Sequence, residues 1–135
     1  MRTQIYPHDN EFMKEENKNN RIDLQDRILN FAVETLKLLM KLPRIKETDV
    51  IRFQLSKSVT AIGANFEEAQ SSGHREFLHK LRLALKESNE TRYWFKILER
   101  LNLQNHASLK ELKEESEQIS RILGAIVAKL AHKHK

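Results

Sequence analysis

Apolar residues recur along most of this chain at intervals of three and four positions, with charged and polar residues between them. This spacing places the apolar side chains on one face of an α-helix, and the alternation typical of strands is absent. Pro43 and the Ser-Ser-Gly run at 71–73 interrupt the pattern, as residues that end helices do. The pattern therefore predicts four helices, over about residues 23–42, 48–71, 74–101 and 108–131.

The second predicted helix carries unusually small side chains. Val59, Ile62 and Phe66 lie on its apolar face, and the residues between them are mostly serine, threonine, alanine and glycine. A glycine in the middle of a helix, such as Gly63, costs about 1 kcal/mol relative to alanine. We therefore expect a packing reason for Gly63, and we predict that this is the most enclosed helix of the fold.

The first predicted helix has two apolar seams rather than one. One seam consists of Leu24, Ile28, Phe31, Ala32, Leu38, Leu39 and Leu42, and the second of Leu29, Val33, Leu36 and Met40. An apolar face this wide exceeds what one helix of a monomeric bundle needs. Either the helix lies deep in the fold or its second seam contacts another subunit, and we expect a homo-oligomer.

Short connections between long helices require each helix to run antiparallel to the next. We therefore predict an all-α fold, an antiparallel up-down-up-down four-helix bundle. The length of 135 residues fits a single domain. Residues 1–20 are polar and lack periodicity, so we predict a disordered or loosely ordered N-terminal arm, followed by the bundle over residues 21–135.

Composition excludes several kinds of chemistry. The chain has no cysteine, so it lacks disulfides, thiolate metal sites and a thiol nucleophile. It also lacks a glycine-rich phosphate loop and a Gly-x-Ser-x-Gly motif. Glu76 and His79 form a single Glu-x-x-His pair, whereas di-iron bundles need two such pairs and two further glutamates. We predict no catalytic residues, no metal and no cofactor, and we keep a metal or small-ligand bundle as a minor alternative.

No apolar run is long enough to span a membrane, and the first residues lack the apolar core of a signal peptide. We therefore expect a cytoplasmic protein without membrane partners.

Positive charge is concentrated on the third predicted helix. The net charge is +5, and residues 74–103 hold seven basic and four acidic side chains. On a helical wheel, His79 and Tyr93 fall among six basic residues opposite the apolar face: Arg75, Arg82, Lys86, Arg92, Lys96 and Arg100. This sector is either a solvated surface with flanking ion pairs or a strip that binds phosphates or an acidic partner.

A second polar group lies near the turn around Gly73. Residues equally far from this turn face each other on the second and third predicted helices. The group consists of Asn65, Glu67, Glu68, Lys86, Glu87 and Glu90. We interpret Asn65, Glu68, Lys86, Glu87 and Glu90 as a structural polar network that fixes the register of the two helices, with a ligand site as the alternative.

Two motifs resemble a known family. They are Ala64, Asn65, Glu68 and Ala69, followed by Phe77, Lys86, Glu87, Glu90, Thr91 and Trp94. The chain resembles, over about residues 22–131, the bacterial four-helix-bundle proteins encoded in intervening sequences of 23S rRNA genes. The resemblance implies an antiparallel bundle that assembles as a ring-shaped homopentamer without catalytic residues. A similar protein is the accessory factor of diversity-generating retroelements, a basic pentamer that binds a reverse transcriptase and nucleic acid.

Two functions remain open. The first is a non-enzymatic homo-oligomer, by family analogy a pentamer, that associates with RNA or a ribonucleoprotein through the basic sector; the analogy adds a reverse transcriptase as a partner. The alternative is a protein–protein interaction scaffold that does not bind nucleic acid. In that case a partner chain would cover Leu78, Leu85, Tyr93 and Ile97, which lie within the basic sector.

Overall fold

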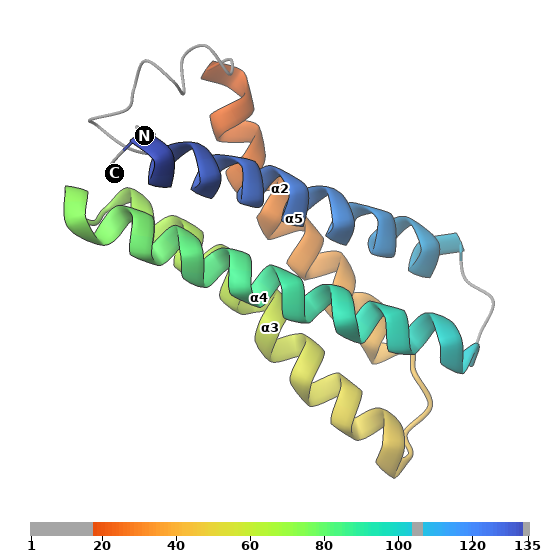
Figure 1. Cartoon of the computed structure of the whole chain (residues 1–135). Helices are drawn as coiled ribbons and strands as arrows, with labels where there is room; N and C mark the ends of the chain where they lie inside the picture. Colours follow the sequence, from red (N-terminus) through yellow and green to blue (C-terminus); the bar gives the residue numbers. More distant parts are fainter. Residues whose placement is uncertain (1–17, 104–106, 134–135) are drawn as a thin grey trace.

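The computed structural model describes residues 18–103 and 107–133, and this part of the chain consists of four α-helices without a strand. They are α2 (Lys18–Met40), α3 (Lys46–Gln70), α4 (His74–Leu101) and α5 (Ala107–Lys133) (Figure 1). Consecutive helices pack against each other, and α5 returns to pack on α2. The predicted all-α four-helix bundle is confirmed.

The helix boundaries lie close to the predicted ones, with the largest difference at the start of α2. This helix begins at Lys18, so residues 18–20, which we assigned to the N-terminal arm, are helical. The remainder of the predicted arm, residues 1–17, lies outside the described residues. The next helix, α3, begins at Lys46 rather than Thr48. The Thr48 hydroxyl instead accepts a hydrogen bond from the backbone N–H of Ile45, at 3.2 Å, within the first turn.

Each helix turns its apolar face toward the centre of the bundle, as the sequence pattern predicts. On α3, the predicted face of Val59, Ile62 and Phe66 is fully buried, and this helix packs most extensively against α4. The rings of Phe31 on α2 and Phe95 on α4 meet with their centroids 5.9 Å apart. Because α2 and α4 each pack along α3 and α5, this ring contact joins two diagonally opposite helices across the core.

The contact between α2 and α3 depends on Gly63. A Cβ atom at this position would lie 3.3 Å from Cγ2 of Ile28, closer than side-chain contacts usually are. Ile28 is itself buried in the core. The close approach of α2 is therefore a packing reason for Gly63 of the kind that the sequence led us to expect.

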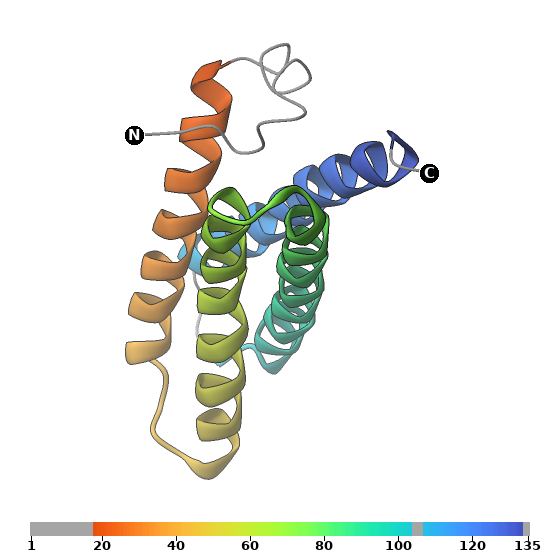
Figure 2. The same ribbon diagram turned by 90° about the vertical axis from the view of Figure 1, so that its left-hand side faces the viewer.

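The helices α2 and α3 run side by side, whereas α5 is inclined to them (Figure 2). Polar contacts near both ends of the α2–α3 pair fix the register of these two helices. Near the turn, Arg52 Nη1 donates to the Leu39 carbonyl oxygen at 2.9 Å and Nη2 to that of Pro43 at 3.1 Å. The Leu39 carbonyl group lies in the last turn of α2 and also accepts a hydrogen bond from the backbone N–H of Leu42 at 3.2 Å, whereas Pro43 follows the helix. At the opposite end, Gln70 Nε2 donates to Gln25 Oε1.

Candidate nucleic-acid interface

The outer surface of α4 presents a continuous row of exposed side chains. The positions are separated alternately by four and three residues, and each is exposed. We call this set the basic row; it consists of Arg75, His79, Arg82, Lys86, Asn89, Tyr93, Lys96 and Arg100. The row contains no carboxylate and extends about 38 Å along the helix, at about 1.5 Å per residue.

The packing of α4 determines where the basic row points. Phe77, Leu81 and Phe95 on the opposite face of the helix are buried in the core, and α3 and α5 cover its two sides. The row is therefore directed away from the bundle and away from α2, the diagonally opposite helix.

The cations of the basic row form no ion pairs with carboxylates in the part of the chain that the structure describes. The ion pairs formed around α4 instead use other lysines. Lys80 Nζ lies 2.8 Å from Glu68 Oε1 on α3, and Lys113 Nζ on α5 lies 3.7 Å from Glu99 Oε1. Within residues 18–103 and 107–133, none of the five row cations forms an ion pair. The flanking ion pairs that a purely solvated surface would use are therefore not made by the row.

Arg92 is the one predicted basic residue that the structure separates from the others. It is half-buried, and its Nε atom is buried without a hydrogen-bond partner in the described part of the chain. The residue faces α5, where the pKa of Glu117 is lowered, first by the hydrogen bond from Lys113 and in smaller part by the charges of Lys113, Arg92 and Arg121. Arg92 therefore does not belong to the exposed row, and its contact with phosphate stays a prediction.

The predicted polar network near the α3–α4 turn does not assemble. Asn65 Nδ2 donates to the carbonyl oxygen of Ala61 in its own helix, at 2.9 Å, and Glu68 pairs with Lys80. Glu90 accepts a hydrogen bond from Trp94 Nε1 at 3.3 Å. No hydrogen bond between described residues connects Asn65 or Glu68 to Lys86, Glu87 or Glu90, because Lys80 lies nearer to α3 while Lys86 points to solvent.

Buried hydroxyl groups make further polar contacts between α4 and its two neighbours. Thr91 Oγ1 donates to Ser58 Oγ at 2.8 Å, which joins α4 to α3, and Ser88 bonds to Ser120, which joins α4 to α5. We did not identify these pairs from the sequence. The available signal was the recurrence of serine and threonine at positions on the apolar face of each helix.

A second exposed surface, on α2, is apolar. Leu29, Val33 and Met40 are 53%, 40% and 70% exposed, and Leu36 between them is half-buried. We call these four residues the α2 stripe; it is the second seam of the sequence pattern. On α3, Phe53 is 65% exposed and lies level with Met40, because the preceding Arg52 reaches the Leu39 carbonyl oxygen. Apart from Leu36, which packs partly against the core, the second seam is therefore exposed on the surface of the chain.

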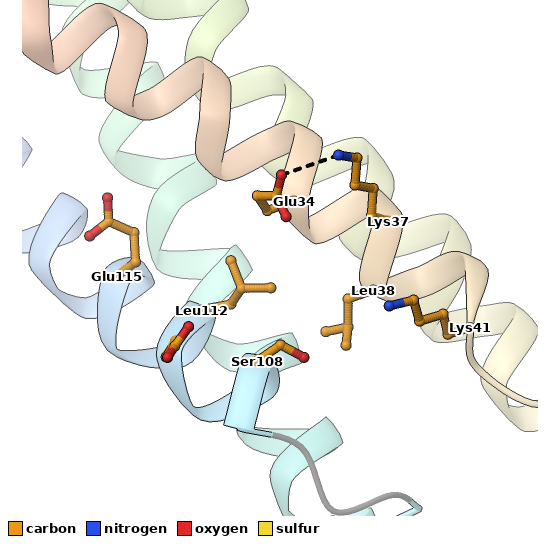
Figure 3. Close-up of a pocket in the computed structure, with 8 residues that line it drawn as sticks. Glu34, Lys37, Leu38, Lys41, Ser108, Leu112 and Glu115 are labelled. Carbon is orange, nitrogen blue, oxygen red and sulfur yellow. Dashed lines mark hydrogen bonds and ion pairs between the residues drawn. The ribbon is translucent and has the colours of Figure 1, made fainter.

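The described residues offer little that suggests metal or small-molecule chemistry. Among them, no group of three or more histidine and carboxylate side chains could hold a metal ion, so Glu76 and His79 have no further ligands there. Between α2 and α5 lies an open cleft of about 290 Å³, in which Leu38 and Leu112 are flanked by charged residues (Figure 3). Glu34 and Lys37 on its rim pair with each other at 3.4 Å. No described helix is both long and apolar enough to cross a membrane.

The fold and surface together define a four-helix-bundle protein whose distinctive features are a cationic helix face and an exposed apolar stripe. The sequence matches the family of 23S rRNA-intervening sequence proteins over residues 20–125, and the chain belongs to that family. The structure is similar to the crystal structure of a protein of unknown function from the S23 ribosomal protein family of Bacteroides thetaiotaomicron. The two share 33% identity with a TM-score of 0.69, covering 77% of this chain and 97% of the other. No curated protein matches the sequence. The resemblance noted from the helix motifs is thereby confirmed.

Proposed function

We propose that this protein is a non-enzymatic homo-oligomer that associates with RNA or a ribonucleoprotein through the basic row of α4. The observation that carries the proposal is the set of five exposed cations without ion-pair partners in the described residues, arranged along one side of a rigid helix. Arginine and lysine in this arrangement are free to contact phosphate oxygens. The link of the family to 23S rRNA genes favours RNA as the partner. An RNA partner also fits the cytoplasmic location that the sequence leads us to expect.

The number of cations sets the expected salt dependence. Five phosphate contacts to a single strand give a slope of about −3.5 for the logarithm of the association constant against the logarithm of salt concentration. Affinity would then fall about a hundredfold between about 50 mM and 200 mM salt. Contacts to phosphates alone distinguish poorly between sequences, so we expect binding that tolerates changes in RNA sequence.

The test is a titration of RNA at several salt concentrations with two variants of equal charge. The double variant Lys86→Gln/Lys96→Gln removes two cations of the row, and its salt slope should become shallower by about 1.4. The control, Lys46→Gln/Lys110→Gln, removes two exposed lysines from α3 and α5. It should keep the slope of the unaltered protein. Equal slopes for the two double variants would refute the assignment of binding to the basic row.

The homo-oligomeric part of the proposal rests on the α2 stripe. Three large side chains that are 40–70% exposed along one helix face form an apolar surface of a kind that usually meets another protein. Family analogy favours a ring-shaped pentamer. Light scattering should give a multiple of the 16.0 kDa chain mass. The variant Met40→Glu should shift the particle toward a single chain, whereas a 16.0 kDa particle for the unaltered protein would contradict the proposal.

A protein–protein interaction scaffold remains the second candidate. Leu78, Leu85 and Ile97 are half-buried beside the basic row, so a protein partner could cover them together with the row. By analogy with the retroelement accessory factor, that partner would be a reverse transcriptase. An oligomer that binds no RNA near physiological salt would favour this second function over the first.

A further inference from the structure

The basic row contains one aromatic side chain, Tyr93, in an unusual setting. Its side chain is 57% exposed, although the other aromatic residues of α4 are buried or half-buried. Lys96 lies one turn away toward the C-terminus, Asn89 one turn away toward the N-terminus, and Lys86 a further turn beyond Asn89. An aromatic ring is therefore held in solvent between positive charges, where it contributes little to the core.

The Tyr93 ring is oriented by its neighbour. The edge of one ring meets the face of the other in the Tyr93–Trp94 pair, with centroids 5.4 Å apart and planes at 72°. Trp94 is half-buried, and its Nε1 donates to Glu90. The tyrosine is thus supported on one side by a ring that is itself tied to the helix, which reduces the entropy that Tyr93 would lose on binding a ligand.

Two chemical features of this position match an unpaired nucleotide. The face of an exposed aromatic ring stacks on any base, and such stacking is worth about 1–3 kcal/mol per base. Lys86 and Lys96 lie about 10 Å and about 4.5 Å along the helix from Tyr93. They can therefore bind the phosphates on either side of a stacked nucleotide, and the amide of Asn89 can hydrogen-bond a base edge.

Paired RNA does not suit this arrangement. In an A-form duplex the base faces are stacked on one another, so an aromatic ring on the surface of a helix cannot stack on them. In single-stranded loops, bulges and ends the bases can be turned outward and stacked on a protein ring. Charge alone would bind both forms, so Tyr93 is the feature that distinguishes them.

We propose that the basic row binds unpaired RNA, with one base stacked on Tyr93 between the phosphate contacts of Lys86 and Lys96. This inference rests on the proposed RNA-binding function and specifies the form of RNA. It assigns to Tyr93 the preference for unpaired strands and to the flanking cations the affinity that both forms share.

The experiment compares an unstructured RNA of about 12 nucleotides with a duplex of the same length, at one salt concentration, by fluorescence anisotropy. The variants are Tyr93→Phe, which keeps the ring, Tyr93→Leu, which keeps apolar bulk without a π face, and Tyr93→Ala. Tyr93→Ala and Tyr93→Leu should weaken binding of the single strand by roughly 5- to 150-fold. Tyr93→Phe should bind almost as the unaltered protein does, and duplex affinity should change by less than about twofold in all three.

Trp94 provides a second readout, because it is the only tryptophan of the chain. A base stacked on Tyr93 lies beside it, so its fluorescence should change when the single strand binds and stay constant with the duplex. Circular dichroism verifies that each variant keeps the helical fold.

The outcomes separate this inference from the proposed function. Salt-dependent binding of both RNAs that no Tyr93 variant alters would overturn the stacking assignment and leave the RNA-binding function intact. Equal losses on single strand and duplex would also overturn it, since they would indicate a general effect on the surface. No binding of either RNA by the unaltered protein would refute the RNA-binding function, and the inference with it.

Discussion

Two glycines in the interior of helices offer a quantitative test of how tightly the bundle is packed. Gly63 on α3 and Gly124 on α5 both have ordinary helical backbone conformations, since no glycine of the chain has a positive φ. A Cβ atom at Gly124 would lie 4.0 Å from Cδ1 of Leu85, an ordinary contact, whereas one at Gly63 would lie 3.3 Å from Cγ2 of Ile28. The two alanine variants should therefore gain the same stability from the change in the backbone, and they differ in the steric cost of the added methyl group.

The backbone term is about 1 kcal/mol in favour of alanine at either position. Gly124→Ala should accordingly raise the free energy of unfolding by about 1 kcal/mol and the melting temperature by about 4 °C. At Gly63 the added methyl requires Ile28 to move by a few tenths of an ångström, and Ile28 is only 1% exposed within the core. We expect the strain to cancel the backbone gain or exceed it, so the two variants should differ by at least about 1 kcal/mol.

Urea denaturation followed by circular dichroism measures both variants, at one protein concentration because self-association would add to the apparent stability. The variant Ile28→Leu removes the Cγ2 methyl that opposes Gly63. The double variant Gly63→Ala/Ile28→Leu should therefore be more stable than the sum of the two single effects. If Gly63→Ala stabilises the protein as much as Gly124→Ala does, close approach of α2 is not what requires glycine at this position.

Three further predictions follow from other contacts. Thr91→Val leaves Ser58 without its interhelical partner and should destabilise the bundle by about 1–2 kcal/mol in urea denaturation, whereas adding Ser58→Ala should recover part of this loss. Because Lys113 lowers the pKa of Glu117, the Glu117 carboxylate stabilises the fold when the pH is above the ordinary pKa of 4.5, and this stability is lost as the pH falls through the lowered pKa of the folded state. In the variant Lys113→Met, an NMR titration should place the pKa of Glu117 nearer 4.5. If the protein is a ring, Met40→Glu should weaken binding of a long RNA that reaches several subunits and spare an RNA of about 12 nucleotides, as gel-shift titrations would detect.

The helices and their buried faces could be predicted from the sequence because both depend on residues a few positions apart. The seam of Leu24, Ile28 and Phe31 repeats with the helical period, and the structure buries it. The second seam of α2 was recognisable for the same reason, since its residues share one face of one helix. The start of α2 at Lys18 was missed because residues 18–20 are polar and carry no apolar repeat.

Contacts between helices were harder to predict, because they depend on the rotation of one helix against another. Arg92 lies at the edge of the basic sector on a helical wheel, and only the position of α5 decides that it is half-buried. Distance from the turn indicated that Glu68 would face α4, but it could not show that Lys80 rather than Lys86 would be its partner. The same applies to Ser58 and Thr91, whose hydroxyls meet only in the observed register of α3 and α4.

The two exposed surfaces lie on diagonally opposite helices, and this arrangement makes the two parts of the proposed function compatible. α2 carries the apolar stripe and α4 the basic row, and each of these helices is separated from the other by α3 and α5. Burying Leu29, Val33 and Met40 against a second copy would therefore leave Arg82, Lys86 and the rest of the row open to solvent. Had both surfaces been on one helix, self-association and RNA binding would compete for it. The opposite placement instead allows an assembly to present one basic row from every subunit.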